Sequence, residues 1–218
     1  VYAILSHECL GIFEAYGTSG NASGPCLPRS LFLRVTHLNT PILTTGRLRL
    51  LPFSEDDFPL LQDLHSDPEV NRYLSPGPAI MDPAEVRRRL ANYVGDHRGT
   101  GMSKWKLETV EGAFIGRAGF SFERNPEGYE LGYSLKRSAW GQGYASEIAR
   151  ALVGWFFDTT QNDHMLAYAV AEHKASQRVM QKAGLRFWRE IRKHGLHCRF
   201  YRITRRQYLQ SLEPGTGG

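Results

Sequence analysis

One segment of this sequence joins a strand pattern to a helix pattern: Tyr129-Glu130-Leu131-Gly132-Tyr133-Ser134-Leu135, followed by Trp140-Gly141-Gln142-Gly143-Tyr144-Ala145-Ser146-Glu147. Apolar and polar residues alternate in its first half, and apolar residues recur at helical spacing over residues 148–157. Gly141 and Gly143 lack Cβ atoms, so the backbone between strand and helix can bring its N–H groups close to a ligand. Because a helix N-terminus carries partial positive charge, this turn favours an anion such as a phosphate or a pyrophosphate.

A dinucleotide-binding turn of the Rossmann type is an alternative for this glycine-rich segment. That fingerprint expects glycine at the position of Ser146, and an acidic residue at the end of the following strand. Asp163 has roughly the required spacing, but it precedes the strand predicted over residues 165–171. The upstream chain also predicts antiparallel hairpins without a strand–helix–strand repeat, which favours a different nucleotide-binding fold.

Length and composition limit the class of protein. With 218 residues, 41% of them hydrophobic, the chain is long enough for one substantial core and short for two. The net charge of +5 is modest and spread along the chain, so it supports a polyanionic small molecule as well as it supports nucleic acid. No aromatic-basic signature accompanies it, and a nucleic-acid partner is not expected.

Cysteine usage and hydropathy predict the compartment. Cys9, Cys26 and Cys198 are odd in number and lack metal-ligand spacing, which favours a reducing, cytoplasmic environment. His194 and His197 precede Cys198 without an evident fourth ligand, so no metal is expected. No apolar run approaches the roughly 18 residues of a membrane-spanning helix, and no membrane association is expected.

The composition and periodicity of the sequence predict a flexible N-terminal segment followed by one domain. Residues 1–44 are poor in charge and rich in Gly, Ser, Thr and Pro, as expected of a flexible lead. Residues 45–212 carry the regular periodicities of an α/β domain. Strands are predicted near residues 47–53, 103–109, 113–122, 129–135, 165–171, 185–191 and 198–203, and helices after residues 54, 67, 82, 144, 174 and 204.

Four blocks, taken in order, resemble the GCN5-related N-acetyltransferase (GNAT) superfamily, and within it the RimJ/RimL-like ribosomal-protein alanine acetyltransferase type. They are Thr45-Gly46-Arg47-Leu48-Arg49-Leu50, Phe114-Ile115-Gly116-Arg117-Ala118-Gly119-Phe120, residues 129–147, and Glu172-His173-Lys174-Ala175-Ser176-Gln177-Arg178-Val179-Met180-Gln181-Lys182-Ala183-Gly184. The resemblance implies a mixed, twisted sheet of about seven strands with helices on both faces. It also implies that the fourth and fifth strands splay apart and that acetyl-CoA lies in the opening.

The resemblance assigns cofactor-binding roles residue by residue. The family pattern Arg/Gln-x-x-Gly-x-Gly/Ala is matched at Gly143 and Ala145, with Trp140 in the Arg/Gln position. His173 stands where the family usually has the Asn that helps to hold the cofactor arm. The backbone near Tyr133, Ser134 and Leu135 is implied to pair with the pantetheine arm, and the amides of Gly141, Gln142, Gly143, Tyr144, Ala145 and Ser146 to hold the pyrophosphate.

Transfer of an acetyl group to an amine needs a base for the amine and a proton for the leaving thiolate. Glu130 is the leading candidate base, on the expectation that apolar neighbours raise its pKa, and Glu172 is the reserve. The alternative is that Glu130 binds only the substrate cation or an arginine. Ser176 is the candidate acid by resemblance, and its alternative role is a helix N-cap.

The sequence therefore predicts an acetyl-CoA-dependent N-acetyltransferase acting on a primary amine, either a protein N-terminal α-amino group or a small molecule. The alternative is a non-catalytic acyl-CoA-binding sensor, because the pyrophosphate turn is better matched than the acid and base. Homodimers are common in the superfamily, so the resemblance also raises a homodimer as a partner state.

Overall fold

A computed structural model of the protein describes residues 40–74, 77–193 and 195–213. Most of the N-terminal segment predicted to be flexible, residues 1–44, lies outside the described residues. His194, one of the two histidines that precede Cys198, also lies outside them. No helix in the described part is long and apolar enough to cross a membrane.

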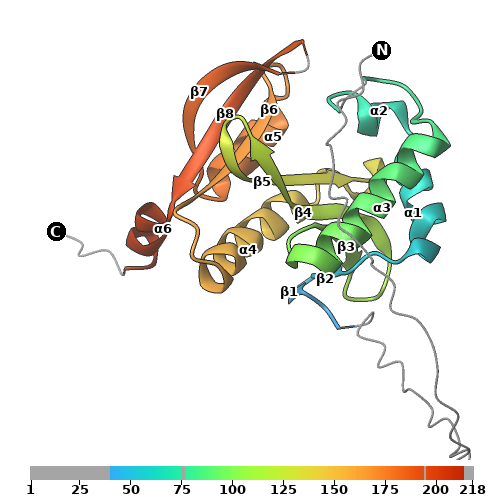
Figure 1. Ribbon diagram of the computed structural model, residues 1–218, viewed down its shortest axis with the longest axis horizontal. Coiled ribbons are helices and arrows are strands. Elements are labelled where there is room, and N and C mark those ends of the chain that lie inside the picture. The colour runs from blue at the N-terminus through green and yellow to red at the C-terminus, as the bar shows by residue number, and fades with distance from the viewer. Residues whose placement is uncertain (1–39, 75–76, 194, 214–218) are drawn as a thin grey trace, which may run out of the picture. The chain divides into compact units, whose positions relative to one another are not determined.

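The described chain forms one sheet of eight strands in the order β1-β2-β3-β4-β5-β6-β8-β7 (Figure 1). Neighbouring strands are antiparallel except β5 and β6, which are parallel, so the sheet is mixed as predicted. One strand more than expected is present, because the two-residue β1 adds to the edge at β2. The strands are β1 Leu43–Thr44, β2 Leu48–Leu51, β3 Lys104–Thr109, β4 Phe114–Arg124, β5 Glu127–Leu135, β6 His164–Val170, β7 Arg186–Lys193 and β8 Leu196–Thr204.

The helices begin where the sequence carries start signals. Asp82 and Asp67 each precede a proline, and their carboxylates accept hydrogen bonds from the amides of Ala84 at 2.7 Å and Glu69 at 2.9 Å. The helices are α1 Phe58–Leu64, α2 Pro68–Asn71, α3 Pro83–Thr100, α4 Tyr144–Thr159, α5 Lys174–Lys182 and α6 Arg205–Leu212, with short 3₁₀ turns at Glu55–Asp57 and Arg137–Ala139.

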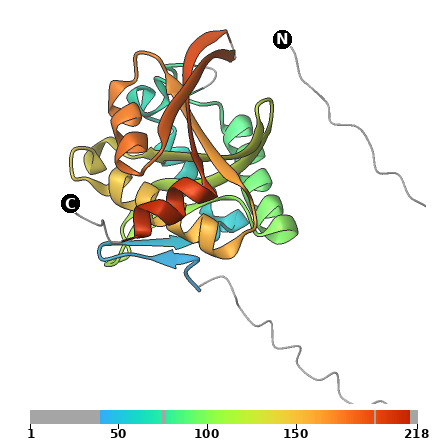
Figure 2. The ribbon, with the colours of Figure 1, turned by 90° about the vertical axis from the view of Figure 1, so that its left-hand side faces the viewer.

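Two apolar cores, one on each face of the sheet, hold the helices in place. On one face, α4 buries Ile148, Leu152 and Phe156 completely against the strands. On the other face, α1 and α3 gather a separate cluster that includes Leu61 and Val86 (Figure 1). The terminal helix α6 lies beside α4 (Figure 2). The prediction of helices on both faces is confirmed.

The parallel strands β5 and β6 are paired only at one end. Their register contains Tyr129 opposite Met165 and Glu130 opposite Leu166, and no further pair among the described residues. Beyond Glu130, β5 runs to Leu135 with its backbone edge toward β6 unpaired, which opens a gap in the sheet. The predicted splay is thus confirmed, displaced by one strand number because of β1.

Candidate functional site

A cleft of about 1100 Å³ lies where β5 and β6 separate. It extends from the glycine turn before α4, past the splayed strands, to the side chains of α2 and α3. The cleft brings together every site residue expected from the sequence except Gln142, whose side chain donates to the Ser138 carbonyl at 2.8 Å. Those lining it are Glu130, Tyr133, Ser134, Leu135, Trp140, Gly141, Gly143, Tyr144, Ala145, Ser146, His173 and Ser176.

The turn before α4 has a backbone that requires glycine. Gly141 and Gly143 have φ of 74° and 81°, in the left-handed region that other residues occupy at a cost. Gly143 is the N-cap of the 16-residue α4, and no described side chain caps this end. The first amides of α4 therefore have no side-chain acceptor among the described residues.

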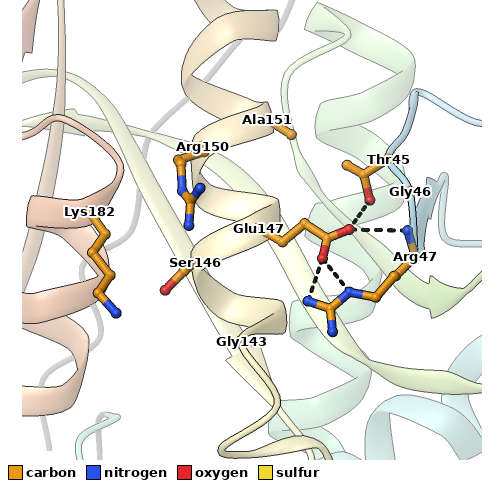
Figure 3. A pocket seen from close by; sticks show the side chains of 9 residues that line it. All are labelled: Thr45, Gly46, Arg47, Gly143, Ser146, Glu147, Arg150, Ala151 and Lys182. Carbon is orange, nitrogen blue, oxygen red and sulfur yellow. Dashed lines mark hydrogen bonds and ion pairs between the residues drawn. The ribbon is translucent and has the colours of Figure 1, made fainter.

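Hydrogen bonds from the segment between β1 and β2 fix the position of this turn. Glu147, in the first turn of α4, accepts hydrogen bonds from the Thr45 hydroxyl at 2.6 Å and from Arg47 Nε at 2.7 Å (Figure 3). Arg47 also donates to the Gln142 carbonyl at 3.1 Å and lies over the Tyr144 ring. Burial opposes ionisation of Glu147, but the hydrogen bonds from Thr45 and Arg47 outweigh it and lower the pKa of the carboxyl. Residues some hundred positions apart thus hold the glycine turn in place.

Trp140, which replaces the Arg/Gln of the expected pattern, joins the turn to β5. Its indole Nε1 donates to the Leu135 carbonyl at 2.9 Å, and its ring stays half-exposed beside the cleft. The residue that departs from the pattern therefore links the turn to the strand.

Two hydroxyls meet inside the cleft between β5 and α5. Tyr133 Oη and Ser176 Oγ lie 2.9 Å apart, and Ser176 is buried. Burial raises the pKa of Tyr133, while its hydrogen bond to Ser176 acts in the opposite sense, so the phenol keeps its proton. The N-cap of α5 is His173, so the alternative role of Ser176 as that cap is wrong.

The imidazole of His173 stacks on Tyr73, with ring centroids 4.1 Å apart and planes 21° apart. Burial lowers the pKa of His173, which favours the neutral ring at physiological pH. The substitution of His for Asn thus links α5 to the segment after α2.

Glu130 lies on a polar face of the sheet, and the expectation of apolar neighbours around its carboxylate is wrong. Its Oε2 accepts from Ser121 Oγ at 2.8 Å and lies 3.4 Å from Lys104 Nζ. The reason is the period of the strand: Leu131 faces the apolar core with α4, and Glu130 points to the opposite face. Glu172, the reserve base, is exposed and is not part of the cleft lining.

Lys104 is a buried ammonium beside the candidate base. Its Nζ donates to the carbonyls of Gly119 and Glu130, each at 3.1 Å. A Cβ on Gly132 would stand 2.7 Å from this nitrogen, so glycine there leaves room for the lysine. Burial lowers the pKa of Lys104 to about 8, while the Glu130 carboxylate opposes the shift and the Arg117 charge adds to it.

We expect Lys104 to titrate near pH 8, well below exposed lysines. NMR of the protein with ¹³Cε-labelled lysine measures this directly, with Lys104→Met used to assign the signal. Since the folded-state pKa is below the ordinary 10.5, the unfolded chain binds more protons between pH 8 and 10.5. The contribution of Lys104 to the free energy of unfolding therefore rises with pH across that window; a titration at the ordinary value contradicts the burial.

Several residues that line the cleft were not predicted from the sequence, among them Lys104, Arg117 and Ser121. The signal was present in the strand periodicity: Arg117, Gly119 and Ser121 alternate with Ala118 and Phe120, and strand positions two apart share a face. No group of three or more metal-ligating side chains gathers anywhere in the described ranges.

Comparisons with known proteins agree with this architecture. The family model of the acetyltransferase (GNAT) domain matches residues 47–186. The uncharacterised protein YkkB of Bacillus subtilis is 34% identical over 155 residues, which cover 69% of this chain and 88% of that protein. An acetyltransferase structure from Agrobacterium tumefaciens is 26% identical, with a TM-score of 0.66 over 75% of this chain and 94% of that one.

A structure of RimL, a ribosomal L7/L12 α-N-protein acetyltransferase in complex with coenzyme A, has the same fold. Its TM-score is 0.66 at 17% identity, over 76% of this chain and 98% of the RimL chain.

Proposed function

This chain belongs to the GNAT acetyltransferase family and is an N-acetyltransferase, and on that premise we propose that it moves the acetyl group of acetyl-CoA directly to a primary amine. One observation carries the proposal. The uncapped amides of the glycine turn, the unpaired edge of β5, and the groups Glu130, Tyr133 and Ser176 all line one cleft.

The turn and the strand edge fit the two ends of a CoA molecule. The amides of residues 141–146 suit the pyrophosphate, because they combine glycine backbone with the positive end of α4. Past Glu130, the unpaired edge of β5 over residues 131–135 offers backbone groups to the amides of the pantetheine arm, as in strand addition. The gap between β5 and β6 then directs the thioester toward the centre of the cleft.

Glu130 is proposed as the group that accepts the proton of the amine. Its Oε2 is held by Ser121 and Lys104, whereas Oε1 makes no hydrogen bond to any described residue. The carboxylate is therefore fixed in orientation with one oxygen free to accept. An ammonium substrate would also be attracted to this oxygen.

Tyr133 and Ser176 are proposed as the hydroxyl pair that protonates the leaving thiolate. Because their oxygens are 2.9 Å apart, one hydroxyl can deliver a proton and regain it from the other. Ser176→Ala and Tyr133→Phe are each expected to lower kcat about tenfold, since the remaining hydroxyl still donates. Single-turnover thiol release measures this; unchanged kcat in the double variant contradicts the assignment.

The acceptor is proposed to be either a protein N-terminal α-amino group, as the RimL likeness suggests, or a small-molecule amine. A thiol-release assay with acetyl-CoA and a panel of N-terminal peptides and small amines tests the function. Acceptor-dependent thiol release supports the transferase. Thermal stabilisation by CoA without turnover of any acceptor supports the alternative, a sensor of acyl-CoA.

A further inference from the structure

Arg117 differs from the other Arg and Lys residues that line the cleft, because each of those is paired with a carboxylate. Arg72 is paired with Glu69, Lys104 with Glu130, and Lys193 with Glu123. Arg88 and Arg89 share Glu85. Arg117 makes no hydrogen bond or ion pair with any residue in the described part of the chain.

The guanidinium of Arg117 is also buried. The residue is 5% exposed, and its Nε is fully enclosed without an acceptor. The guanidinium carbon lies 5.6 Å from the centroid of the Tyr93 ring. An arginine remains protonated in proteins, and burying its charge without an anion is costly. The arrangement therefore lacks a counter-ion that a ligand can supply.

Arg117 lies on the same side of the sheet as Glu130, the proposed base for the amine. Arg117 lies opposite Ser134 of β5, and Ser121, four residues further along β4, lies opposite Glu130. Residues at even spacing project from one face, so Arg117 and the Ser121–Glu130 pair share the same side of the sheet, with their Cα atoms about 13 Å apart along the strand. The side chains of Arg117 and Glu130 both line the same cleft.

Resting on the proposed function, we infer that the amine acceptor carries a carboxylate and that Arg117 binds it, while Glu130 receives the amine. A planar guanidinium matches a carboxylate with two parallel hydrogen bonds. A single negative charge suits the site, since Glu130, Glu123 and Glu85 line the same cleft and would repel a dianion. Arg117 is thus a specificity-determining residue.

Paired acceptors test this inference. Glycine, 3-aminopropanoate, 4-aminobutanoate and 5-aminopentanoate are compared with their carboxamides, and N-terminal peptides with Asp at the second position are compared with those with Asn. The amino acids and the peptides separate a small-molecule source of the carboxylate from a protein source. We expect kcat/KM for at least one acid to exceed that of its neutral partner by about tenfold or more.

Three variants assign the preference to Arg117. Arg117→Gln should reduce the acid preference to less than about threefold, chiefly through KM, and Arg117→Lys should restore part of it. Arg88→Gln removes a lining cation that already has a carboxylate partner and should leave the preference unchanged. Equal rates for acids and neutral partners in the wild type, or a preference that survives Arg117→Gln, overturn the inference.

Thermal stabilisation by the acceptors tests the role of Arg117 without requiring turnover. In the presence of CoA, the same acids should raise the Tm of the wild type more than their neutral partners do, and Arg117→Gln should lose that difference. Acid-selective stabilisation without thiol release sustains the role of Arg117 and contradicts the proposed transferase. Absence of any acid-selective stabilisation overturns the role, whatever the activity.

Discussion

Gly143→Glu is expected to abolish stabilisation by CoA and to lower kcat/KM for acetyl-CoA by at least about a hundredfold. The substitution places a carboxylate at the proposed pyrophosphate site, where charge-assisted hydrogen bonds contribute about 1.5–3 kcal/mol each. It also forces a side chain into a backbone with φ of 81°. Differential scanning fluorimetry with and without CoA, followed by thiol-release kinetics, measures both effects.

Gly112→Glu is a matched control for this variant. Gly112 is exposed, has φ of 93°, and its added Cβ would lie 3.7 Å from an arginine nitrogen, compared with 3.6 Å at Gly143. It lies in the turn between β3 and β4 and is not part of the cleft lining. The control should show similar backbone strain and normal stabilisation by CoA. Equal loss of CoA binding in both variants would show that strain, and not the anion site, causes the defect.

Glu130→Gln is expected to lower kcat by about 10²–10³-fold, because the amide cannot accept the proton of the amine. The variant also leaves the Lys104 ammonium buried without its carboxylate, at a cost of about 3 kcal/mol in the free energy of unfolding near pH 7. That cost should shrink above pH 8, where Lys104 loses its proton. Stopped-flow thiol release and urea unfolding at pH 7 and pH 9 measure the two effects separately.

Glu123→Gln is the control for this variant, because it removes a carboxylate and an ion pair from the cleft without removing the proposed base. Glu123 lines the same cleft and forms a partly buried ion pair with Lys193, so its loss also costs stability. We expect kcat to change by less than about threefold. If Glu130→Gln retains wild-type kcat, Glu130 only holds Lys104 or attracts the substrate, and the base lies elsewhere.

The fold was largely predictable because its signals are local. Apolar periodicity identified β2–β8, and the acidic caps and prolines placed the starts of α2 and α3, since these interactions join residues two to four positions apart. The turn at Gly141 and Gly143 was predictable for the same reason: its backbone geometry and its helix N-terminus are properties of one short segment. Among the strands of the described residues, only the two-residue β1 lacked enough pattern to be foreseen.

The chemistry of the cleft could not be predicted in this way, because it depends on strand register. Lys104 meets Glu130 across 26 positions of sequence, and Arg47 meets Glu147 across 100. A shift of one residue in β3 or β5 would turn Lys104 or Glu130 to the other face of the sheet. Short-range sequence patterns therefore dictate the helices, the strands and the glycine turn. Assembly of the sheet dictates which charges are neutralised, and it leaves Arg117 without a partner among the described residues.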